Sequence, residues 1–326
     1  MLESIYHLAD NGHGWLLSLK QSWNPDTFRK DRRPLIIIPG YGMNSFIFGW
    51  HPSGPSMTEF LAERGFEVWA VDLRAQGHAV CKGGSANYRI EDVALGDLEV
   101  VFRTLLEHTR TTQDRIDAIG CSLGGTYLYV HAALVDDHPL ASIVGMGAPL
   151  RWDTANPIIR LAFSQPGLVA KIPVTGVKRM ARLAIPLLSR FPFLLHIYMH
   201  PEMIDTSNLD RLVEAVEDPN PVLNQDMAWW FRRRDLLIQG KLISEELHRV
   251  TLPFFCMYGN GDGVVPPESA LSAYECIGTP EDRKATHLVG TDTLKFAHAD
   301  MFISDPAQEL VFTPLADWLE HLYQQT

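Results

Sequence analysis

The sequence lacks several features that would indicate a specialised protein class. Only four of its 326 residues are cysteine, these form no C-x-x-C pair, and no run of eighteen uncharged apolar residues occurs. We therefore predict neither a disulfide scaffold nor a membrane-spanning helix. The first fifteen residues contain an early Glu3 and no apolar stretch of the kind found in secretory signals, so we expect a cytoplasmic location.

Positive charge is also scarce. The chain has 28 Lys and Arg against 39 Asp and Glu, a formal net charge of −11. A general nucleic-acid binder needs a basic face to neutralise phosphates, so no nucleic-acid partner is expected. There is no G-x-G-x-x-G or phosphate-loop pattern either, and we predict that the protein uses no cofactor.

Short apolar runs alternate with helical patterns over most of the chain. Helix-face spacing of apolar residues predicts helices over 56–64 and 91–108, and Asn11-Gly12 predicts an N-terminal hairpin. The predicted buried strands are 35–38, 67–72, 116–120, 142–146, 253–258 and 286–289. This alternation predicts an α/β fold with a mostly parallel, doubly wound sheet.

The C-terminal segment has the signals of a last helix. Asp305 followed by Pro306 is typical of an N-cap and first helical position, and Pro314 then predicts a kink or an early break. The strand–helix alternation lapses between about 150 and 250, where eight prolines separate helical apolar segments. We therefore expect a core formed by 1–150 and 251–326, with a helical cap inserted at 151–250.

Gly120-Cys121-Ser122-Leu123-Gly124 matches the pattern G-x-S-x-G. It directly follows a predicted strand, and an apolar helical stretch begins at Thr126. A sharp strand-to-helix turn needs small flanking residues, here Gly120 and Gly124, and it raises the serine oxygen clear of the sheet. Ser122 is therefore the predicted nucleophile. The alternative is a glycine-rich turn with an incidental serine.

A serine hydroxyl needs a base, and the base needs an acid to orient it. With the chain order Ser, acid, His expected on this sheet, the candidate bases are His287, His298 and His321. We predict His298, which lies in the loop between the last strand and the last helix, at the carboxyl edge of the sheet. Asp262 at the end of the 253–258 strand is the predicted acid, with Glu268, Asp292 and Asp300 as alternatives.

The negative charge that forms on a substrate oxygen needs fixed N–H donors. One follows the nucleophile, the backbone N–H of Leu123. The second is expected from the loop after strand 35–38, where Gly40 and Gly42 permit a close backbone approach, and we predict the N–H of Tyr41.

These motifs together resemble the α/β-hydrolase superfamily. The resemblance rests on Pro39-Gly40-Tyr41-Gly42, the segment 72–78, the Ser122 motif, the segment 261–266 and His298, and it covers the chain outside the insertion. It implies that 151–250 is the family's cap and that 72–78 is a structural loop, although Ala75 replaces the usual glycine. Two further departures are Pro39 before the oxyanion glycine and Ala297 before the histidine.

Within the superfamily, segments 61–69 and 298–319 resemble the acid-lipase and polyhydroxyalkanoate-synthase branches. The synthases carry cysteine where Ser122 stands, and Cys121 is one position too early to replace it. The main prediction is a serine hydrolase that cleaves a hydrophobic carboxylic ester through an acyl-enzyme. The alternatives are an acyltransferase or thioesterase with the same triad and, third, a non-catalytic binding protein.

No metal site is predicted. His196 and His200 have i, i+4 spacing, but the pair lacks the glutamate of H-E-x-x-H and any obvious third ligand. Residues 151–200 contain seven basic residues against one acid, among many apolar residues. This pattern predicts either weak contact with a lipid surface or, as the simpler alternative, a cap with basic groups facing water. In both cases we expect apolar residues of the cap to line the substrate site, which favours a hydrophobic ester or thioester substrate.

Overall fold

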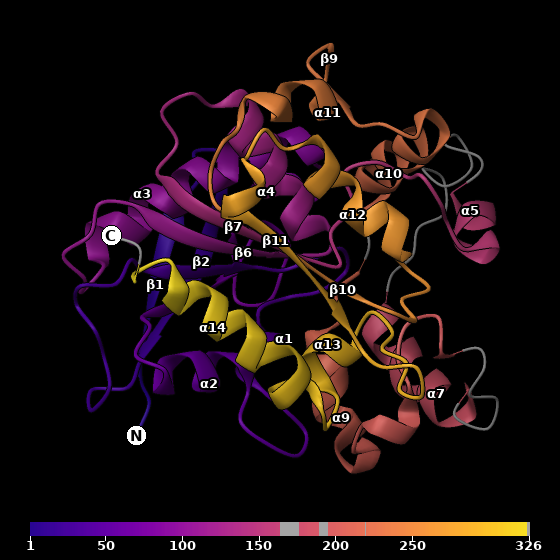
Figure 1. Cartoon of the computed structure of the whole chain (residues 1–326). Coiled ribbons are helices and arrows are strands. Elements are labelled where there is room, and N and C mark those ends of the chain that lie inside the picture. Colours follow the sequence, from indigo (N-terminus) through magenta and orange to yellow (C-terminus); the bar gives the residue numbers. More distant parts are fainter. Residues whose placement is uncertain (164–175, 189–194, 219, 325–326) are drawn as a thin grey trace.

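The computed structural model describes residues 1–163, 176–188, 195–218 and 220–324. Its centre is a nine-stranded sheet with the order β1-β2-β4-β3-β6-β7-β10-β11, and β5 pairs with β2 (Figure 1). The strands are β1 (Glu3–Asp10), β2 (Trp15–Trp23), β3 (Leu35–Ile38), β4 (Val68–Asp72), β5 (Val80–Cys81), β6 (Ile116–Cys121), β7 (Leu140–Met146), β10 (Phe254–Gly259) and β11 (Lys284–Val289).

The sheet confirms the predicted fold class. β1 and β2 form the expected antiparallel hairpin, and β2 pairs antiparallel with β4. From β4 to β11 all pairings along the sheet are parallel. The six predicted strands are all present, with ends that differ from the prediction by at most two residues. Five of them are mostly buried, but β11 lies at the edge of the sheet and is partly exposed, with Leu288 50% exposed.

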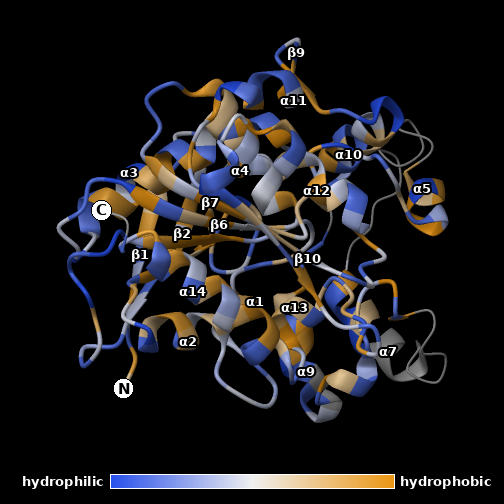
Figure 2. Cartoon of the chain, in the orientation of Figure 1, coloured by the Kyte–Doolittle hydropathy of each residue, from blue (hydrophilic) through white to orange (hydrophobic). Residues whose placement is uncertain are grey.

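Helices cover both faces of the sheet (Figure 1). One layer contains α3 (Leu98–His108), α4 (Leu123–Leu134) and α12 (Pro267–Cys276). The other contains α1 (Phe46–Gly49), α2 (Met57–Glu63), α13 (Asp300–Ile303) and α14 (Thr313–His321). The apolar strands lie between these layers, as the hydropathy colouring shows (Figure 2).

Strand β3 shows why the sheet is buried on both sides. Ile36 and Ile38 pack into the hydrophobic cluster that includes Leu98 of α3, whereas Leu35 and Ile37 pack into the opposite cluster. Successive side chains of a strand point to opposite faces, so a continuous apolar run is what a two-sided core requires.

The segment between β7 and β10 is mostly helical. Its helices are α5 (Pro157–Ala162), α7 (Val177–Leu188), α9 (Leu209–Leu212), α10 (Pro221–Arg233) and α11 (Ile243–Glu246), with 3-10 turns η2 (Pro201–Met203), η3 (Thr206–Asn208), η4 (Val213–Ala215) and η5 (Leu247–Arg249). The segment also contains a small hairpin of β8 (Leu237–Ile238) with β9 (Lys241–Leu242), where the sequence analysis predicted helical segments.

The division into core and cap stays a prediction. Ile243 and Leu247, near the end of the insertion, belong to the same hydrophobic cluster as Leu128 of α4.

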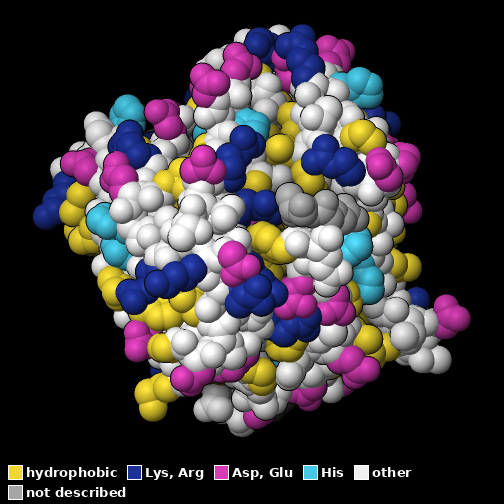
Figure 3. Space-filling view, turned by 60° about the vertical axis from the view of Figure 1, so that its left-hand side comes forward, with side chains coloured by type: hydrophobic (Ala, Val, Ile, Leu, Met, Phe, Trp, Pro, Cys, Tyr) yellow, Lys and Arg dark blue, Asp and Glu magenta, His cyan; other side chains and the backbone are white. Residues whose placement is uncertain are grey.

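Lys171 and Arg190, two of the basic residues counted above, lie outside the described residues. None of the described helices is long and apolar enough to cross a bilayer. Acidic and basic side chains are interspersed over the face shown in Figure 3.

Two predicted helices differ in detail from the structure. The 91–108 helix begins with a π-helical stretch, η1 (Asp92–Asp97), before α3. At the C-terminus, Asp305 does not cap a helix, since the first helical stretch is the π-helical η7 (Gln308–Phe312) and Asp305 accepts a hydrogen bond from Ser53. Pro314 occupies the first turn of α14, directly after this π-helical stretch, where its missing N–H costs little.

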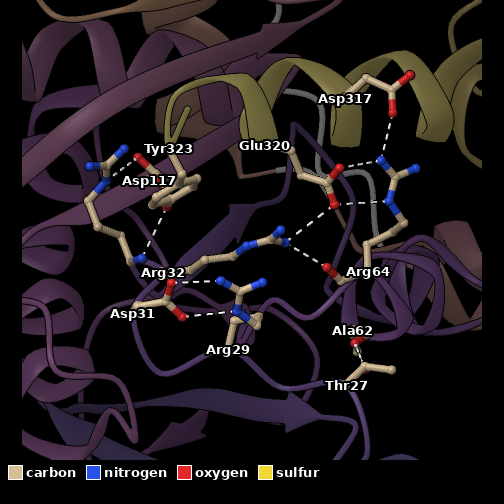
Figure 4. Close-up of polar contacts among 11 residues, drawn as sticks. Thr27, Arg29, Asp31, Arg32, Ala62, Arg64, Asp117, Asp317, Glu320 and Tyr323 are labelled. Atoms are coloured by element: carbon tan, nitrogen blue, oxygen red, sulfur yellow. Dashed lines mark hydrogen bonds and ion pairs between the residues drawn. The ribbon is translucent and has the colours of Figure 1, made fainter. Parts of the chain in front are cut away.

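Polar contacts fix α14 and the residues after it to the core (Figure 4). Arg64, at the end of α2, binds Glu320 through two nitrogens, with Nε 3.0 Å from Oε1 and a terminal nitrogen 2.6 Å from Oε2. The Tyr323 hydroxyl donates to the buried carboxylate of Asp117 in β6, which also pairs with Arg33 Nε at 2.9 Å. The C-terminal helix is therefore tied to both α2 and the middle of the sheet.

Candidate active site

Ser122 lies on a strained turn between β6 and α4. Its φ is +53° and its ψ is −124°, one of four non-glycine residues with positive φ among those described. Such a backbone costs of order 1–3 kcal/mol and persists where the surrounding structure enforces it. The N–H of Ser122 donates to Met146 O of β7 at 2.8 Å, which holds the turn against the sheet.

The flanking glycines are required because the turn is crowded. A Cβ on Gly120 would lie 2.3 Å from Gly125 Cα, and one on Gly124 would lie 2.3 Å from Ile38 O. Neither distance is compatible with a side chain. The G-x-S-x-G pattern is thus explained by close contact of α4 with β6 and β3.

Asp262 and His298 form a buried pair. His298 Nδ1 lies 2.6 Å from Asp262 Oδ2, and the other carboxylate oxygen accepts N–H bonds from Val264 and Val265 at 2.9 and 2.8 Å. The carboxylate is therefore fixed by its own loop and in turn orients the imidazole. A carboxylate on Nδ1 leaves Nε2 as the nitrogen that can accept a proton.

The alternative acids are engaged elsewhere. Asp300 binds His200 Nδ1 at 2.6 Å, and Glu268 accepts a hydrogen bond from Thr154 Oγ1 at 2.8 Å. Asp292 is exposed in the loop after β11. Among the alternative bases, His287 Nε2 contacts Leu310 O at 3.1 Å within the fold. Of the predicted acids, Asp262 is the one placed on His298.

Ser122 and His298 line one cavity of about 230 Å³. No hydrogen bond joins Ser122 Oγ to His298 in the described structure. Hydrogen bonds of this kind commonly shorten only when a substrate binds, so the arrangement is compatible with proton transfer between the two groups.

The two predicted oxyanion donors also line this cavity, since Tyr41 and Leu123 both contribute to its wall. The backbone N–H groups of both residues donate to no acceptor among the described residues, which leaves them available to a ligand. The Tyr41 loop is anchored on the insertion by two backbone bonds: Glu217 N donates to Gly42 O at 2.8 Å, and Asn44 N donates to Ala215 O at 3.0 Å. Position 42 favours glycine because its φ is +65°.

The rest of the cavity wall is apolar. No Asp, Glu, Lys or Arg is among the described residues that line it. The Tyr41 hydroxyl donates to Asn224 Oδ1 of α10, so this phenol is engaged with the insertion. Large apolar side chains make up most of the wall, including Ile47, Phe48, Trp152, Met227, Trp230 and Phe302.

Two neighbouring motifs have structural roles, as the sequence indicated. Burial raises the pKa of the Cys121 thiol well above its ordinary value, so this thiol stays protonated and is a poor nucleophile. Asp72 accepts N–H bonds from Ser45 and His78 at 2.7 and 2.8 Å. Ala75 adopts a φ of +60°. Glycine adopts this conformation without strain, which fits the glycine usual at this position in the α/β-hydrolase pattern.

Sequence reasoning missed the segment that supports the pair of Asp262 and His298. Ile197 O accepts a bond from Gly263 N at 3.1 Å, and Tyr198 O accepts one from Ala299 N at 2.8 Å. Two backbone carbonyls of the insertion thus hold the loops that carry Asp262 and His298. No sequence signal marks these contacts, because any residue type can supply a carbonyl.

The order of the sheet and the sharp turn at Ser122 are those of the α/β hydrolases. The chain belongs to the family described as "Serine aminopeptidase, S33", whose model matches residues 35–289.

Solved structures show the same fold at low sequence identity. The chain is similar to an esterase from Exiguobacterium antarcticum, with 15% identity, a TM-score of 0.63, and coverage of 97% of this chain and 100% of that one. A putative aryl esterase from Burkholderia cenocepacia has 15% identity, a TM-score of 0.62, and coverage of 98% and 100%. A bromoperoxidase from Bacillus anthracis has 14% identity, a TM-score of 0.63, and coverage of 97% and 100%.

Proposed function

We propose that this protein is a serine hydrolase that cleaves a carboxylic ester with a hydrophobic acyl group. The observation that carries the proposal is the strained Ser122 turn in the same cavity as the His298–Asp262 pair. A serine incidental to a tight turn would have no reason to occupy a positive φ that glycine adopts without strain.

In the proposed reaction, Ser122 Oγ attacks the acyl carbon while His298 Nε2 takes the hydroxyl proton. Asp262 holds the Nδ1–H of the imidazole and stabilises the imidazolium. The N–H groups of Tyr41 and Leu123 bind the oxyanion, and His298 returns the proton to the departing alcohol. Water then attacks the acyl-enzyme with His298 as base, which releases the acid and restores Ser122.

The cavity supports an ester of an apolar acyl group over the N-terminal amine of a peptide. An aminopeptidase must compensate a substrate ammonium, and no carboxylate lines the described cavity wall. An acyl chain instead gains free energy by leaving water, about 0.8 kcal/mol for each methylene buried. The similar fold of two esterases is in keeping with this choice.

The insertion is proposed to act as the cap of this cavity. Met227 and Trp230 of α10, together with Ile159 and Phe163 near α5, contribute apolar side chains to the cavity wall. A wall built partly from the insertion couples substrate length to the packing of the cap on the core.

The test is a series of p-nitrophenyl esters of increasing acyl length, measured on the wild type and on Ser122→Ala. We expect kcat/KM to rise with chain length from acetate, and Ser122→Ala to lose at least about 10³-fold. A fluorophosphonate probe should add one mass increment to the wild type, mapped to Ser122, and none to the variant.

Absence of turnover on every ester would contradict the proposal, and turnover that survives in Ser122→Ala would contradict the nucleophile. Addition of an alcohol acceptor separates hydrolysis from the predicted alternative. Acyl transfer that exceeds hydrolysis would reassign the protein as an acyltransferase with the same residues.

A further inference from the structure

A second cluster of imidazole and carboxylate groups lies apart from the Ser122 cavity. His196, His200 and Glu202 each offer one ligand atom, and these atoms all lie within 4.8 Å of one another. The sequence showed no obvious third ligand for the histidine pair, and the structure places Glu202 beside it as a candidate. Turn η2, which begins at Pro201, brings Glu202 back toward His196, a placement that the spacing of the two histidines does not reveal.

His200 is oriented by the buried carboxylate of Asp300. The Nδ1 of His200 lies 2.6 Å from Oδ2, while the backbone N–H of His200 donates to Oδ1 at 2.9 Å and that of Ala297 donates to Oδ2 at 2.7 Å. The carboxylate acts as acceptor in all three contacts, so Nδ1 carries the proton. The lone pair of His200 is then on Nε2, and a carboxylate behind an imidazole is the support that metal-binding histidines usually have.

His196 presents a ring nitrogen to Glu202. Its Nε2 forms no hydrogen bond among the described residues and lies 3.3 Å from Glu202 Oε1, within ion-pair distance. The rings of His196 and His200 are 4.5 Å apart between centroids. The imidazole nitrogen and the carboxylate oxygen thus face each other without a hydrogen bond, and one metal ion would bind both.

We propose that His196, His200 and Glu202 bind a divalent transition-metal ion, with Zn²⁺ as the best match. Two imidazole nitrogens and one carboxylate oxygen are a donor set that Zn²⁺ accepts, with water in the fourth position of a tetrahedron. Mg²⁺ and Ca²⁺ prefer oxygen ligands throughout, so the two histidines select against them.

The site would act on the loop of His298 through Asp300. Oδ2 of this carboxylate contacts both His200 Nδ1 and the N–H of Ala297, the residue before His298. Metal binding at His200 would fix the imidazole that fixes Asp300, and so restrain the loop. The inference about binding is independent of the proposed ester hydrolysis, because it uses none of the residues assigned to that reaction.

The experiment measures Zn²⁺ binding to the full chain after chelator treatment, by competition with a chromophoric chelator. We expect one ion per chain. The dissociation constant should be at least about tenfold larger in His196→Gln and in Glu202→Gln. Glu202 is exposed, so its substitution should leave the fold intact, which circular dichroism checks. The control is His13→Gln, a change of an exposed histidine in the N-terminal hairpin, which should bind as the wild type does.

A Co²⁺-loaded sample should show visible absorption typical of four-coordinate cobalt, and this absorption should fall in both variants. Ser122→Ala should bind Zn²⁺ as the wild type does, so a failure of ester hydrolysis and a failure of metal binding are told apart. The proposal is overturned if the wild type shows no saturable binding, or if both variants retain its affinity.

Discussion

Gly40 lies so close to Ser122 that a Cβ on Gly40 would stand 2.8 Å from the Ser122 Cβ and 2.9 Å from Cys121 O. We therefore predict that Gly40→Ala displaces the Ser122 turn or the Tyr41 loop. A displacement of about 1 Å in a catalytic arrangement can cost on the order of 10²-fold, and we expect a loss of kcat/KM of that size. Ester hydrolysis and thermal unfolding are measured together.

The matched control is Gly49→Ala, at the end of α1. A Cβ there would meet nothing within 4 Å, and Gly49 is not among the described residues with positive φ. This variant should retain wild-type kinetics. Equal activity losses in the two variants would show that the contact between Gly40 and Ser122 is not what matters.

The second prediction concerns the acid. Asp262→Asn replaces the carboxylate on His298 Nδ1 by an amide, which removes the charge that stabilises the imidazolium and favours the wrong tautomer. We expect kcat to fall by about 10³–10⁴-fold. The amide oxygen can still accept the N–H groups of Val264 and Val265, so the fold should survive.

The comparison is Asp292→Asn, which changes an exposed carboxylate in the loop after β11 and should leave activity unaffected. Steady-state kinetics on one good ester substrate distinguishes the two. A loss confined to Asp292→Asn would reverse the assignment of the acid.

The third prediction is a dependence of stability on pH through His131. Burial lowers the pKa of this imidazole from 6.5 to about 4, although its Nδ1 contacts Ala94 O at 2.7 Å. The unfolded chain therefore binds a proton at a higher pH than the folded chain does. The contribution is complete above pH 6.5 and is lost as the pH falls from there toward 4.

Each unit of pKa difference corresponds to 1.36 kcal/mol, so His131 should account for about 2 kcal/mol of the stability lost between pH 7 and pH 5. Urea unfolding at the two pH values measures this loss. His131→Gln should reduce it by that amount, whereas His13→Gln should not. An unchanged pH dependence in His131→Gln would assign the acid sensitivity to other groups.

The parts of this protein that sequence reasoning found are those encoded locally. Strand 35–38 is a run of apolar residues stopped by Pro39-Gly40, and the structure contains it with the same ends. The Ser122 turn was found because its glycines and its flanking strand and helix are contiguous in the chain. The pairing of Asp262 with His298 followed from chain order and the common edge where parallel strands end.

What sequence reasoning did not find depends on contacts between distant segments. His200 and Asp300 are 100 residues apart, and no periodicity links them. The π-helical stretch at Asp92–Asp97 reads as ordinary helix, since apolar spacing does not separate the two helix types. Asp305 is of a residue type that often caps helices, but its carboxylate accepts a hydrogen bond from Ser53 instead.

The fourth prediction uses the backbone of Ser122. Ser122→Gly removes the Cβ that makes a φ of +53° costly, which should stabilise the folded state by about 1–3 kcal/mol. The greater conformational freedom of glycine in the unfolded chain offsets about 0.5–1 kcal/mol of this gain. Ser122→Ala keeps the Cβ and the strain. We expect both variants to be inactive, with the glycine variant about 1 kcal/mol more stable in urea unfolding. A glycine variant less stable than the alanine variant would show that the turn is relaxed.

That strain also bears on how the position would evolve. Folding favours glycine at 122, while the chemistry proposed here needs a nucleophilic side chain, so the two requirements select different residues. A lineage released from the need for catalysis would gain stability by drifting to glycine. A serine at this backbone angle is therefore what we expect where selection for a nucleophile outweighs the cost in stability.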